Sequence, residues 1–322
     1  MAVITQDIDI VATALRDGEL AAIPTETVYG LAGNALNPHA VAGIFEAKRR
    51  PSFDPLIMHL PTAEAVADYV TDFPAELRAL AKTLWPGPLT LLLPRAQDVP
   101  DLVTSGLERV AVRVPAHPLA LALLEQLDFP LAAPSANPFG YISPTTAAHV
   151  QAQLGERIPW ILDGGAADVG IESTIVGVEN GRTCIYRLGG VPVDQIEAIV
   201  GAVTVQSHSS SRPQAPGLLE QHYAPGTRFL LGERSALAKA ASDDGQRVAV
   251  LNFAHHLPGI DPALQRVLSH DGNLRDAASH LFSAMRELDS LGVDVIVAEP
   301  VPAEGLGLAI NDRLQRAAAP VD

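Results

Sequence analysis

Four short segments of the chain carry residue types that bind anions or hold a nucleotide. The first, Pro24–Leu31 (PTETVYGL), places two hydroxyls, a carboxylate and a phenol directly after a short apolar stretch that predicts a buried strand. Ligands of open α/β sheets dock where strands end. A capped turn that leads from the strand into a helix explains the same residues without a ligand. The sequence leaves both interpretations open.

The second segment is a run of three cations. Lys48-Arg49-Arg50 stands at the end of a predicted helix and is followed by PSFDPLIMH, which contains Asp54 and His59. Ammonium and guanidinium groups bind phosphate oxygens through charge-assisted hydrogen bonds. Cations at a helix C-terminus also complement the helix dipole. An anion site and a dipole-stabilised helix end are therefore the two interpretations of this run.

The third and fourth segments also carry groups that bind anions, and each has a second interpretation without a ligand. Arg109 and Arg113 share one face of a predicted strand, because alternate residues of a strand point the same way. They form either a clamp for phosphate or carboxylate or a solvated edge face.

Ser135 and Asn137 (in APSAN) come directly after another predicted strand, and Ser143 follows soon after. Hydroxyl, amide and backbone N–H groups of this kind hold phosphate oxygens, and they also form ordinary turns.

Composition excludes several other kinds of function. The 322 residues carry 22 Lys and Arg against 37 Asp and Glu, a net charge of -15, which disfavours nonspecific nucleic-acid binding. Cys184, the one cysteine, allows neither an intrachain disulfide nor a cysteine zinc site, and we expect a buried structural thiol. Walker, H-E-x-x-H and G-x-S-x-G motifs are absent. With no signal peptide and no apolar run of about 18 residues, we expect a cytoplasmic protein without membrane spans.

Strand and helix patterns alternate along the first two thirds of the chain, which predicts an α/β sheet rather than a bundle or a sandwich. The predicted helices are 8–16, 38–50, 63–70, 74–84, 118–127 and 193–200. The predicted strands are 20–23, 56–60, 89–93, 110–114, 131–133, 158–162, 174–178 and 184–188.

A Ser- and Pro-rich stretch, QSHSSSRPQAPG at 206–217, predicts a linker. After it the pattern restarts with strands 228–231, 247–253 and 293–298 and helices 235–241, 274–291 and 308–318. That order predicts a small Rossmann-like unit. We therefore expect a catalytic domain over 1–205, a linker over 206–227 and a C-terminal domain over 228–322.

Taken together, the motifs resemble those of a known family. PTETVYGLAGNA, KRRPSFDPLIMHL, RVAVRVP, APSAN, IESTIV and IYRLG occur in this order, and HYAP follows the linker. The set closely resembles the YrdC-like threonylcarbamoyl-AMP synthase family in its two-domain form. The resemblance implies an open twisted mixed sheet with a concave cationic cleft, followed by the smaller Rossmann-like α/β domain.

The resemblance also implies a reaction. L-Threonine, bicarbonate and ATP would be condensed to threonylcarbamoyl-AMP and pyrophosphate, with Mg²⁺ bridging the ATP phosphates and no metal ligand supplied by the protein. This step is an adenylyl transfer, the work of a nucleotidyltransferase. A separate transferase complex would then move the threonylcarbamoyl group to the tRNA adenosine next to the anticodon. We expect no stable nucleic-acid binding by this chain itself.

By family position, residues of this sequence receive roles. The threonine-binding set is Thr27, His59, Arg113, Ala133 and Ser173. The ATP-binding set is Lys48, Arg50, Asp54, Arg109, Ser135, Asn137, Ser143, Arg187 and Tyr223, with Lys48 and Arg50 as the catalytic cations. Arg113 would pair with the threonine carboxylate. The linker would act as a lid, with Tyr223 capping the ATP. Asp54 stands where much of the family has Asn, and would repel phosphate unless it binds the metal or points away.

Two other functions compete with this one. An RNA-binding module of the same fold would need a basic surface, and only 5% of the residues are aromatic, which leaves few for stacking on bases. A carbamoyl-transferring domain of a maturation enzyme would need additional segments, among them zinc fingers, that a chain with one cysteine lacks.

Overall fold

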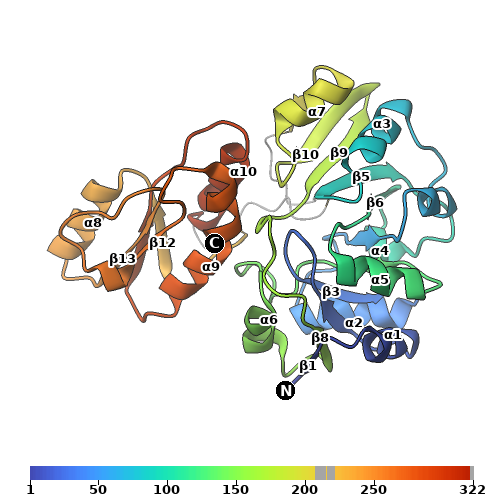
Figure 1. Ribbon diagram of the computed structural model, residues 1–322, viewed down its shortest axis with the longest axis horizontal. Coiled ribbons are helices and arrows are strands. Elements are labelled where there is room, and N and C mark those ends of the chain that lie inside the picture. The colour runs from blue at the N-terminus through green and yellow to red at the C-terminus, as the bar shows by residue number, and fades with distance from the viewer. Residues whose placement is uncertain (207–214, 216–221, 320–322) are drawn as a thin grey trace. The chain divides into compact units, whose positions relative to one another are not determined.

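The computed structural model describes residues 1–206, 215 and 222–319, which form two compact units (Figure 1). The first unit takes the described residues of Met1–Phe139, Pro144–Asp168 and Glu172–Leu219. The second takes those of Gly140–Ser143, Val169–Ile171 and Glu220–Asp322. Two short pieces of the N-terminal part of the chain therefore belong to the second unit. Most of the predicted linker, 207–214 and 216–221, lies outside the described residues.

A mixed sheet forms the centre of the first unit. Its described strands are β1 (Val3–Thr5), β2 (Ala21–Ile23), β3 (Gly30–Asn34), β4 (Ile57–His59), β5 (Leu89–Pro94), β6 (Arg109–Arg113), β7 (Leu131–Ala132), β8 (Trp160–Leu162), β9 (Thr174–Glu179), β10 (Arg182–Arg187) and β11 (Thr204–Val205). They lie in the order β1-β8-β2-β3-β7-β4-β6-β5-β9-β10-β11. β4 and β6 are parallel neighbours, whereas β6 and β5 are antiparallel.

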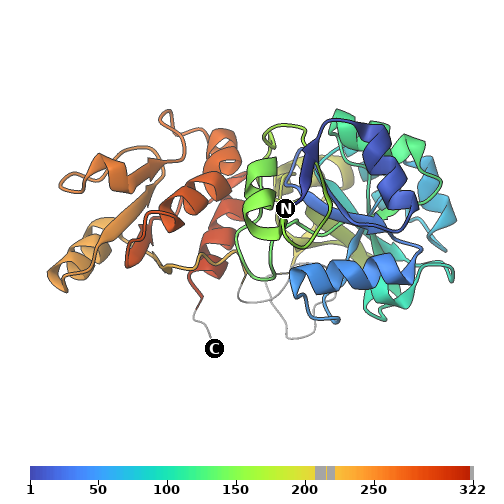
Figure 2. The ribbon, with the colours of Figure 1, turned by 90° about the horizontal axis from the view of Figure 1, so that it is seen from below.

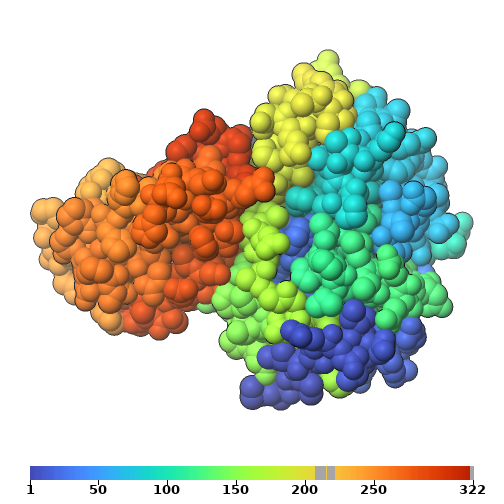
Figure 3. All heavy atoms as spheres, viewed as in Figure 1, coloured from blue at the N-terminus to red at the C-terminus, as the bar shows by residue number. Residues whose placement is uncertain are grey.

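Helices cover both faces of this sheet. They are α1 (Ile8–Arg16), α2 (Pro38–Lys48), α3 (Ala75–Leu84), α4 (Asp101–Thr104), α5 (Pro118–Gln126), α6 (Ala147–Leu154) and α7 (Val193–Val200), with a 3₁₀ helix η1 (Glu64–Asp68). Within β2, Ala22 packs in one apolar core with residues of α2 and α3. Its neighbours Ala21 and Ile23 pack in another core with α1 and α5. Figure 2 shows α1 and α2 on opposite sides of the strands, and in Figure 3 the surfaces of α3 and α7 adjoin.

Local sequence explains where the helices begin and end. The Asp7 carboxylate accepts from the backbone N–H groups of Asp9 and Ile10 and caps α1, whose predicted bounds are confirmed. α2 ends at Lys48, two residues earlier than predicted, because Arg49 adopts a left-handed conformation with φ of 53°. Arg50 therefore lies beyond the end of the helix, and the direction of its side chain is not set by the helix.

Three expectations from the sequence were wrong or incomplete. The predicted helix at 63–70 is the shorter 3₁₀ helix η1. The pattern missed β1, β3, β11, α4 and α6, all of which are short or poorly marked by apolar spacing. Because β3 pairs antiparallel with β2, the PTETVYG segment joins two strands and is not a turn into a helix.

The second unit is a three-layer structure around a parallel sheet. Its strands are β12 (Arg228–Leu231), β13 (Val248–Asn252), β14 (Gln265–Val267) and β15 (Val295–Ala298), in the order β12-β15-β13-β14. Its helices are α8 (Arg234–Asp243), α9 (Leu274–Asp289) and α10 (Gly307–Ala317), with a 3₁₀ helix η2 (Pro262–Leu264). α8 covers one face, and α9 and α10 cover the other (Figure 1). The Rossmann-like prediction is confirmed, with β14 as an additional strand.

Gly189, which follows β10, is closely packed against the backbone around Ser173. A Cβ on Gly189 would lie 2.3 Å from the Glu172 carbonyl oxygen and 2.4 Å from the Ser173 carbonyl carbon, both backbone atoms. We expect Gly189→Ala to lower the free energy of unfolding by about 1–3 kcal/mol in chemical denaturation.

Gly43→Ala, inside α2, is the matched control. A Cβ there meets only the Leu20 side chain, at 3.4 Å, so we expect stability to be unchanged or to rise by about 0.5–1 kcal/mol. Equal stability of the two variants would contradict the crowding around Ser173.

Candidate functional site

One face of the central strands carries three of the predicted site residues, His59, Arg109 and Arg113. An apolar cluster on it contains Ile57, Leu92, Ala111, Ile175, Cys184 and Tyr186. Because alternate residues of a strand share a face, His59 lies on the side of Ile57, and Arg109 and Arg113 lie on the side of Ala111. Ala215, a described linker residue between two undescribed stretches, is fully buried in the same cluster.

Arg113 is held on this face by three groups of the protein. Its Nε donates to the Gly87 carbonyl oxygen (3.2 Å) and its Nη1 donates to the Thr27 hydroxyl (2.9 Å). Its Nη2 lies 2.6 Å from Oε1 of Glu26 in an ion pair. The residue is 3% exposed, and β6 lies between β4 and β5, so the alternative of a solvated edge face was wrong.

His59 stands beside Arg113 across the β4–β6 ladder, in which the two are direct partners. Its Nδ1 is 3.3 Å from the Ile57 carbonyl oxygen. Burial, and after it the positive charge of Arg113, lowers the pKa of His59 from 6.5 to about 3. The imidazole is therefore neutral at physiological pH, and it offers a ligand hydrogen bonds but no charge.

Ser173 is tied to two neighbouring strands. Its hydroxyl is 2.7 Å from that of Thr90 on β5. Arg187 donates to the Ser173 carbonyl oxygen from Nε (3.0 Å) and to the Ser173 hydroxyl from Nη2 (3.1 Å). The ladder between β9 and β10 shifts register between Ile185 and Arg187, and a bulge of this kind re-aims a side chain. The bulge accounts for the contact of Arg187 with Ser173.

Lys48 is buried beneath the turn that carries Ser135 and Asn137. Its Nζ donates to the carbonyl oxygens of both residues, at 2.5 Å each. Burial, followed by the charge of Arg50, moves the pKa of Lys48 well below its ordinary value, while Asp54 opposes that shift. Lys48 thus holds the shape of the turn, and its side chain lies against the backbone of two other predicted ATP contacts, Ser135 and Asn137.

Asp54 is fully buried and forms an ion pair with Arg50, whose Nη2 is 2.9 Å from Oδ2. Arg50 also donates to the backbone carbonyl oxygens of Asp54 (3.0 Å) and Pro55 (2.8 Å). The negative charge that the sequence places near the predicted phosphate site is therefore neutralised by its neighbour. Asp54 acts on Arg50, and its predicted contact with ATP remains a prediction.

Arg109 lies over the ring of Tyr186, with its guanidinium carbon 5.0 Å from the ring centroid, and its Nη1 donates to the Tyr186 hydroxyl at 2.7 Å. That hydroxyl donates in turn to Oε2 of Glu179 (3.1 Å). Gln206, next to the undescribed part of the linker, donates to the same oxygen at 2.5 Å. A hydrogen-bonded chain therefore runs from a predicted nucleotide contact to the start of the linker.

The remaining predicted residues are Ala133, Ser143 and Tyr223. Ala133 is buried, and its N–H donates to the Ile57 carbonyl oxygen (3.0 Å), at the start of β4. Ser143 and Tyr223 belong to the second unit. Tyr223 is 1% exposed and stacks on Phe282 with 5.4 Å between the ring centroids. The predicted ATP contacts of Ser143 and Tyr223 remain predictions.

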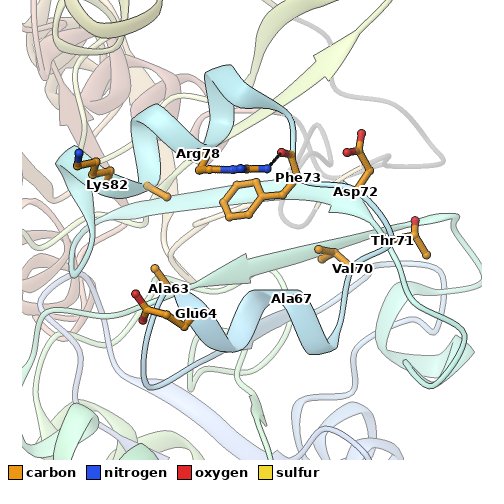
Figure 4. Close-up of a pocket in the computed structure, with 10 residues that line it drawn as sticks. Ala63, Glu64, Ala67, Val70, Thr71, Asp72, Phe73, Arg78 and Lys82 are labelled. Atoms are coloured by element: carbon orange, nitrogen blue, oxygen red, sulfur yellow. Dashed lines mark hydrogen bonds between the residues drawn. The ribbon is translucent and has the colours of Figure 1, made fainter.

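A separate hollow lies between η1 and α3 (Figure 4), with a cavity volume of about 660 Å³. It is lined by Ala63, Glu64, Ala67, Val70, Thr71, Asp72, Phe73, Arg78, Ala81 and Lys82. Arg78 lies over the Phe73 ring, 5.6 Å from its centroid. None of the residues assigned to threonine or ATP lines this hollow, so it is not the predicted site.

Sequence reasoning missed two polar residues of the site. Glu26 stands within the PTETVYGL segment, but nothing in the pattern pairs it with Arg113, which is 87 positions away along the chain. Thr90 lies in the apolar strand LTLLL, where a single hydroxyl reads as an ordinary strand residue. Only the sheet topology brings these two residues to the site.

Comparisons with known proteins agree over nearly the whole chain. The family model Sua5_yciO_yrdC, described as "Telomere recombination", matches residues 13–189, and the model of the threonylcarbamoyl-AMP synthase C-terminal domain matches residues 191–319. The threonylcarbamoyl-AMP synthase of Pyrococcus abyssi is 40% identical, and the alignment covers 96% of this chain and 93% of that protein. The chain belongs to the threonylcarbamoyl-AMP synthase family.

Two further relatives support this assignment. The threonylcarbamoyl-AMP synthase of Bacillus subtilis is 41% identical over 95% of this chain and 91% of that protein. The crystal structure of Pyrococcus abyssi Sua5 complexed with L-threonine matches with a TM-score of 0.92 at 38% identity, covering 99% of this chain and 97% of that one. The family fold predicted from the motifs is thereby confirmed for both units. In the described part of this family member, no helix has the length and apolarity that a membrane span needs.

The low pKa of His59 generates a prediction about acid stability. Folding keeps the imidazole neutral, so the unfolded chain binds the proton more readily between pH about 6.5 and 3. The stability that depends on neutral His59 is complete above pH 6.5 and is lost as the pH falls towards 3. We expect His59→Gln to be less sensitive to pH than the parent in this window, as measured by urea denaturation.

His39→Gln serves as the control, because His39 is exposed on α2. Its stability should follow that of the parent at every pH. If His59→Gln follows the parent as closely as the control does, His59 is not a buried neutral imidazole.

Proposed function

We propose that this chain is an L-threonylcarbamoyladenylate synthase that condenses L-threonine, bicarbonate and ATP to threonylcarbamoyl-AMP and releases pyrophosphate. Family membership supports the activity, and one observation ties it to this chain's own geometry. Arg113 is buried, and two hydrogen bonds and an ion pair with Glu26 hold it on the face that carries His59 and Ser173. A guanidinium has five N–H donors, so each Nη atom of Arg113 keeps a second N–H for a ligand carboxylate.

The predicted threonine residues provide complementary groups around that carboxylate. Neutral His59 and the Ser173 hydroxyl offer hydrogen bonds to the substrate. The Thr27 hydroxyl can accept one, because its own proton goes to the Thr25 hydroxyl (2.8 Å), which itself donates to the Val28 carbonyl oxygen. The Pyrococcus abyssi relative has been solved with L-threonine, which supports threonine as the ligand of this site. Because these side chains are fixed before the ligand arrives, little order has to be created on binding.

The predicted ATP residues would act by position and charge. Lys48, Arg50 and Arg187 would stabilise charge that develops on the α-phosphate as the N-carboxythreonine oxygen attacks and pyrophosphate leaves. This chemistry makes the enzyme a nucleotidyltransferase. Ala215, buried on the same face, supports a linker that excludes water from the carbamate and the mixed anhydride.

Mg²⁺ would enter with ATP and neutralise phosphate charge, with its ligands supplied mainly by the nucleotide. Among the described residues, no group of three or more His, Cys, Asp or Glu is placed to hold a metal ion. Asp54, the carboxylate of the predicted ATP set, already pairs with Arg50. These residues fit a metal that is carried by the substrate.

The partners of this enzyme would be the proteins that use its product, threonylcarbamoyl-AMP. We propose that a tRNA threonylcarbamoyl transferase complex takes the product, in the cytoplasm, where ATP, threonine and tRNA occur. The alternative of an RNA-binding module is not favoured by the geometry. Lys48, Arg50, Arg113 and Arg187 are all less than 9% exposed, whereas RNA backbone binding needs cations at the surface.

The reaction itself is the first test. Purified protein with ATP, L-threonine, bicarbonate and Mg²⁺ should release pyrophosphate and form an AMP adduct of the mass of threonylcarbamoyl-AMP, measured by mass spectrometry. Omitting threonine or bicarbonate should abolish the adduct. Pyrophosphate release that is unchanged without either compound would overturn the proposed function.

Arg113→Lys tests the assigned threonine contact. Lysine keeps the charge but loses the planar pair of donors, so we expect the KM for threonine to rise by about 10- to 100-fold while the KM for ATP changes much less. Arg78→Lys, at the hollow between η1 and α3, is the control and should leave both constants unchanged. An unaltered threonine KM in Arg113→Lys would remove Arg113 from the threonine site.

A further inference from the structure

Glu26 is a buried carboxylate without a hydrogen bond. The residue is 7% exposed, and in the described part of the chain neither of its carboxylate oxygens accepts a hydrogen bond. Among the described residues its charged partner is Nη2 of Arg113, at 2.6 Å, in a contact that lacks the alignment of a hydrogen bond. A buried carboxylate normally accepts several hydrogen bonds, because it has lost those that water would make. Glu26 therefore has acceptor positions that a ligand's donors would satisfy.

Hydrogen bonds hold the backbone of the loop on both sides of Glu26, and the ion pair with Arg113 holds its carboxylate. The Thr25 hydroxyl donates to the Val28 carbonyl oxygen (2.6 Å) and accepts from the N–H groups of Thr27 and Val28, at 3.2 Å each. Thr27, the next residue, accepts from Arg113. Glu26 and Arg113 thus present a fixed anion and a fixed cation side by side.

The charges of this pocket select the kind of ligand. Glu26 and Arg113 neutralise one another, and His59 is uncharged because its pKa is about 3. A carboxylate that arrived alone would add an unbalanced negative charge beside a buried anion, which is costly in a site of low polarity. A zwitterion brings its own cation, and the ammonium group of an α-amino acid is bonded to the carbon that bears the carboxylate.

We propose that Glu26 is the site for the α-ammonium group of the substrate amino acid, and that the Glu26–Arg113 pair selects zwitterions. This inference rests on the proposed function, in which Arg113 binds the substrate carboxylate. An ammonium group has three N–H donors. Glu26 offers it Oε2, and also Oε1 beside its ion pair with Arg113, because neither oxygen accepts a hydrogen bond from a described residue. Charge-assisted hydrogen bonds of this kind are among the stronger ones in proteins.

Binding measurements with two ligands test the inference. We would titrate the full chain and its Glu26→Gln variant, by isothermal calorimetry, with L-threonine and with 2,3-dihydroxybutanoate, in which a hydroxyl replaces the ammonium group. We expect Glu26→Gln to weaken threonine binding by about 10- to 100-fold and to leave the affinity for the hydroxy acid unchanged or higher. Glu76→Gln, an exposed carboxylate on α3, is the matched control and should bind both ligands like the parent.

The comparison separates a contact with the ammonium group from a role through Arg113. If Glu26→Gln lowered the affinity for both ligands equally, Glu26 would only position Arg113. If the threonine affinity were unchanged, Glu26 would have no role in threonine binding. Either result overturns the inference. If Glu26→Gln does not fold, as judged by circular dichroism, Glu26→Asp replaces it. Its shorter carboxylate should reduce the preference for threonine over the hydroxy acid, and an undiminished preference overturns the inference.

The parent protein distinguishes this failure from failure of the proposed function. Threonine binding by the parent together with normal affinity in Glu26→Gln would refute only the ammonium site. If the parent bound no threonine and made no adduct, the proposed function would fail, and the inference would fail with it.

Discussion

The buried Arg113 guanidinium is the interaction on which the arrangement of the candidate site depends. It joins the loop between β2 and β3 (Glu26 and Thr27), the turn before β5 (Gly87) and strand β6. Burying a lone charge is strongly unfavourable, so the cation requires these partners, and they in turn are fixed by it. This mutual requirement holds segments that are distant in sequence at one place on the sheet. The same requirement makes the site rigid before any ligand binds.

The other cations of the site follow the same rule. Arg50 pairs with Asp54, Arg187 binds Ser173, and Lys48 binds the carbonyl oxygens of the Ser135–Asn137 turn. A chain with a net charge of -15 therefore concentrates a few cations in its interior, each held by groups of the protein. Such cations are unsuited to a nucleic-acid surface. They are suited to small anions that enter a site from which water is excluded, where electrostatic interactions are stronger than in bulk water.

Local signals in the sequence predicted much of the fold. α1 and α7 were predicted with their observed bounds, and the ordered motifs predicted the family fold. Short strands without a marked pattern, such as β3, were missed, because their pairing is decided by tertiary context. Missing β3 also led to the wrong alternative for the PTETVYG segment.

Side-chain partners were harder to predict than elements. The sequence placed Arg109 and Arg113 on one strand face. It could not predict the ion pair of Arg113 with Glu26 or that of Asp54 with Arg50, because loop conformations decide where these side chains point. The left-handed Arg49 and the register shift before Arg187 are backbone features with no marked sequence signal, and each redirects a site arginine. The transfer of Gly140–Ser143 and Val169–Ile171 to the second unit likewise has no signal in the sequence.

The most direct test of the central claim is a crystal structure of this protein with bound L-threonine. The account predicts the threonine carboxylate within about 3 Å of the Arg113 guanidinium nitrogens, with the ammonium group facing the Glu26 carboxylate. Threonine bound with its carboxylate away from Arg113, or at another part of the first unit, would contradict it.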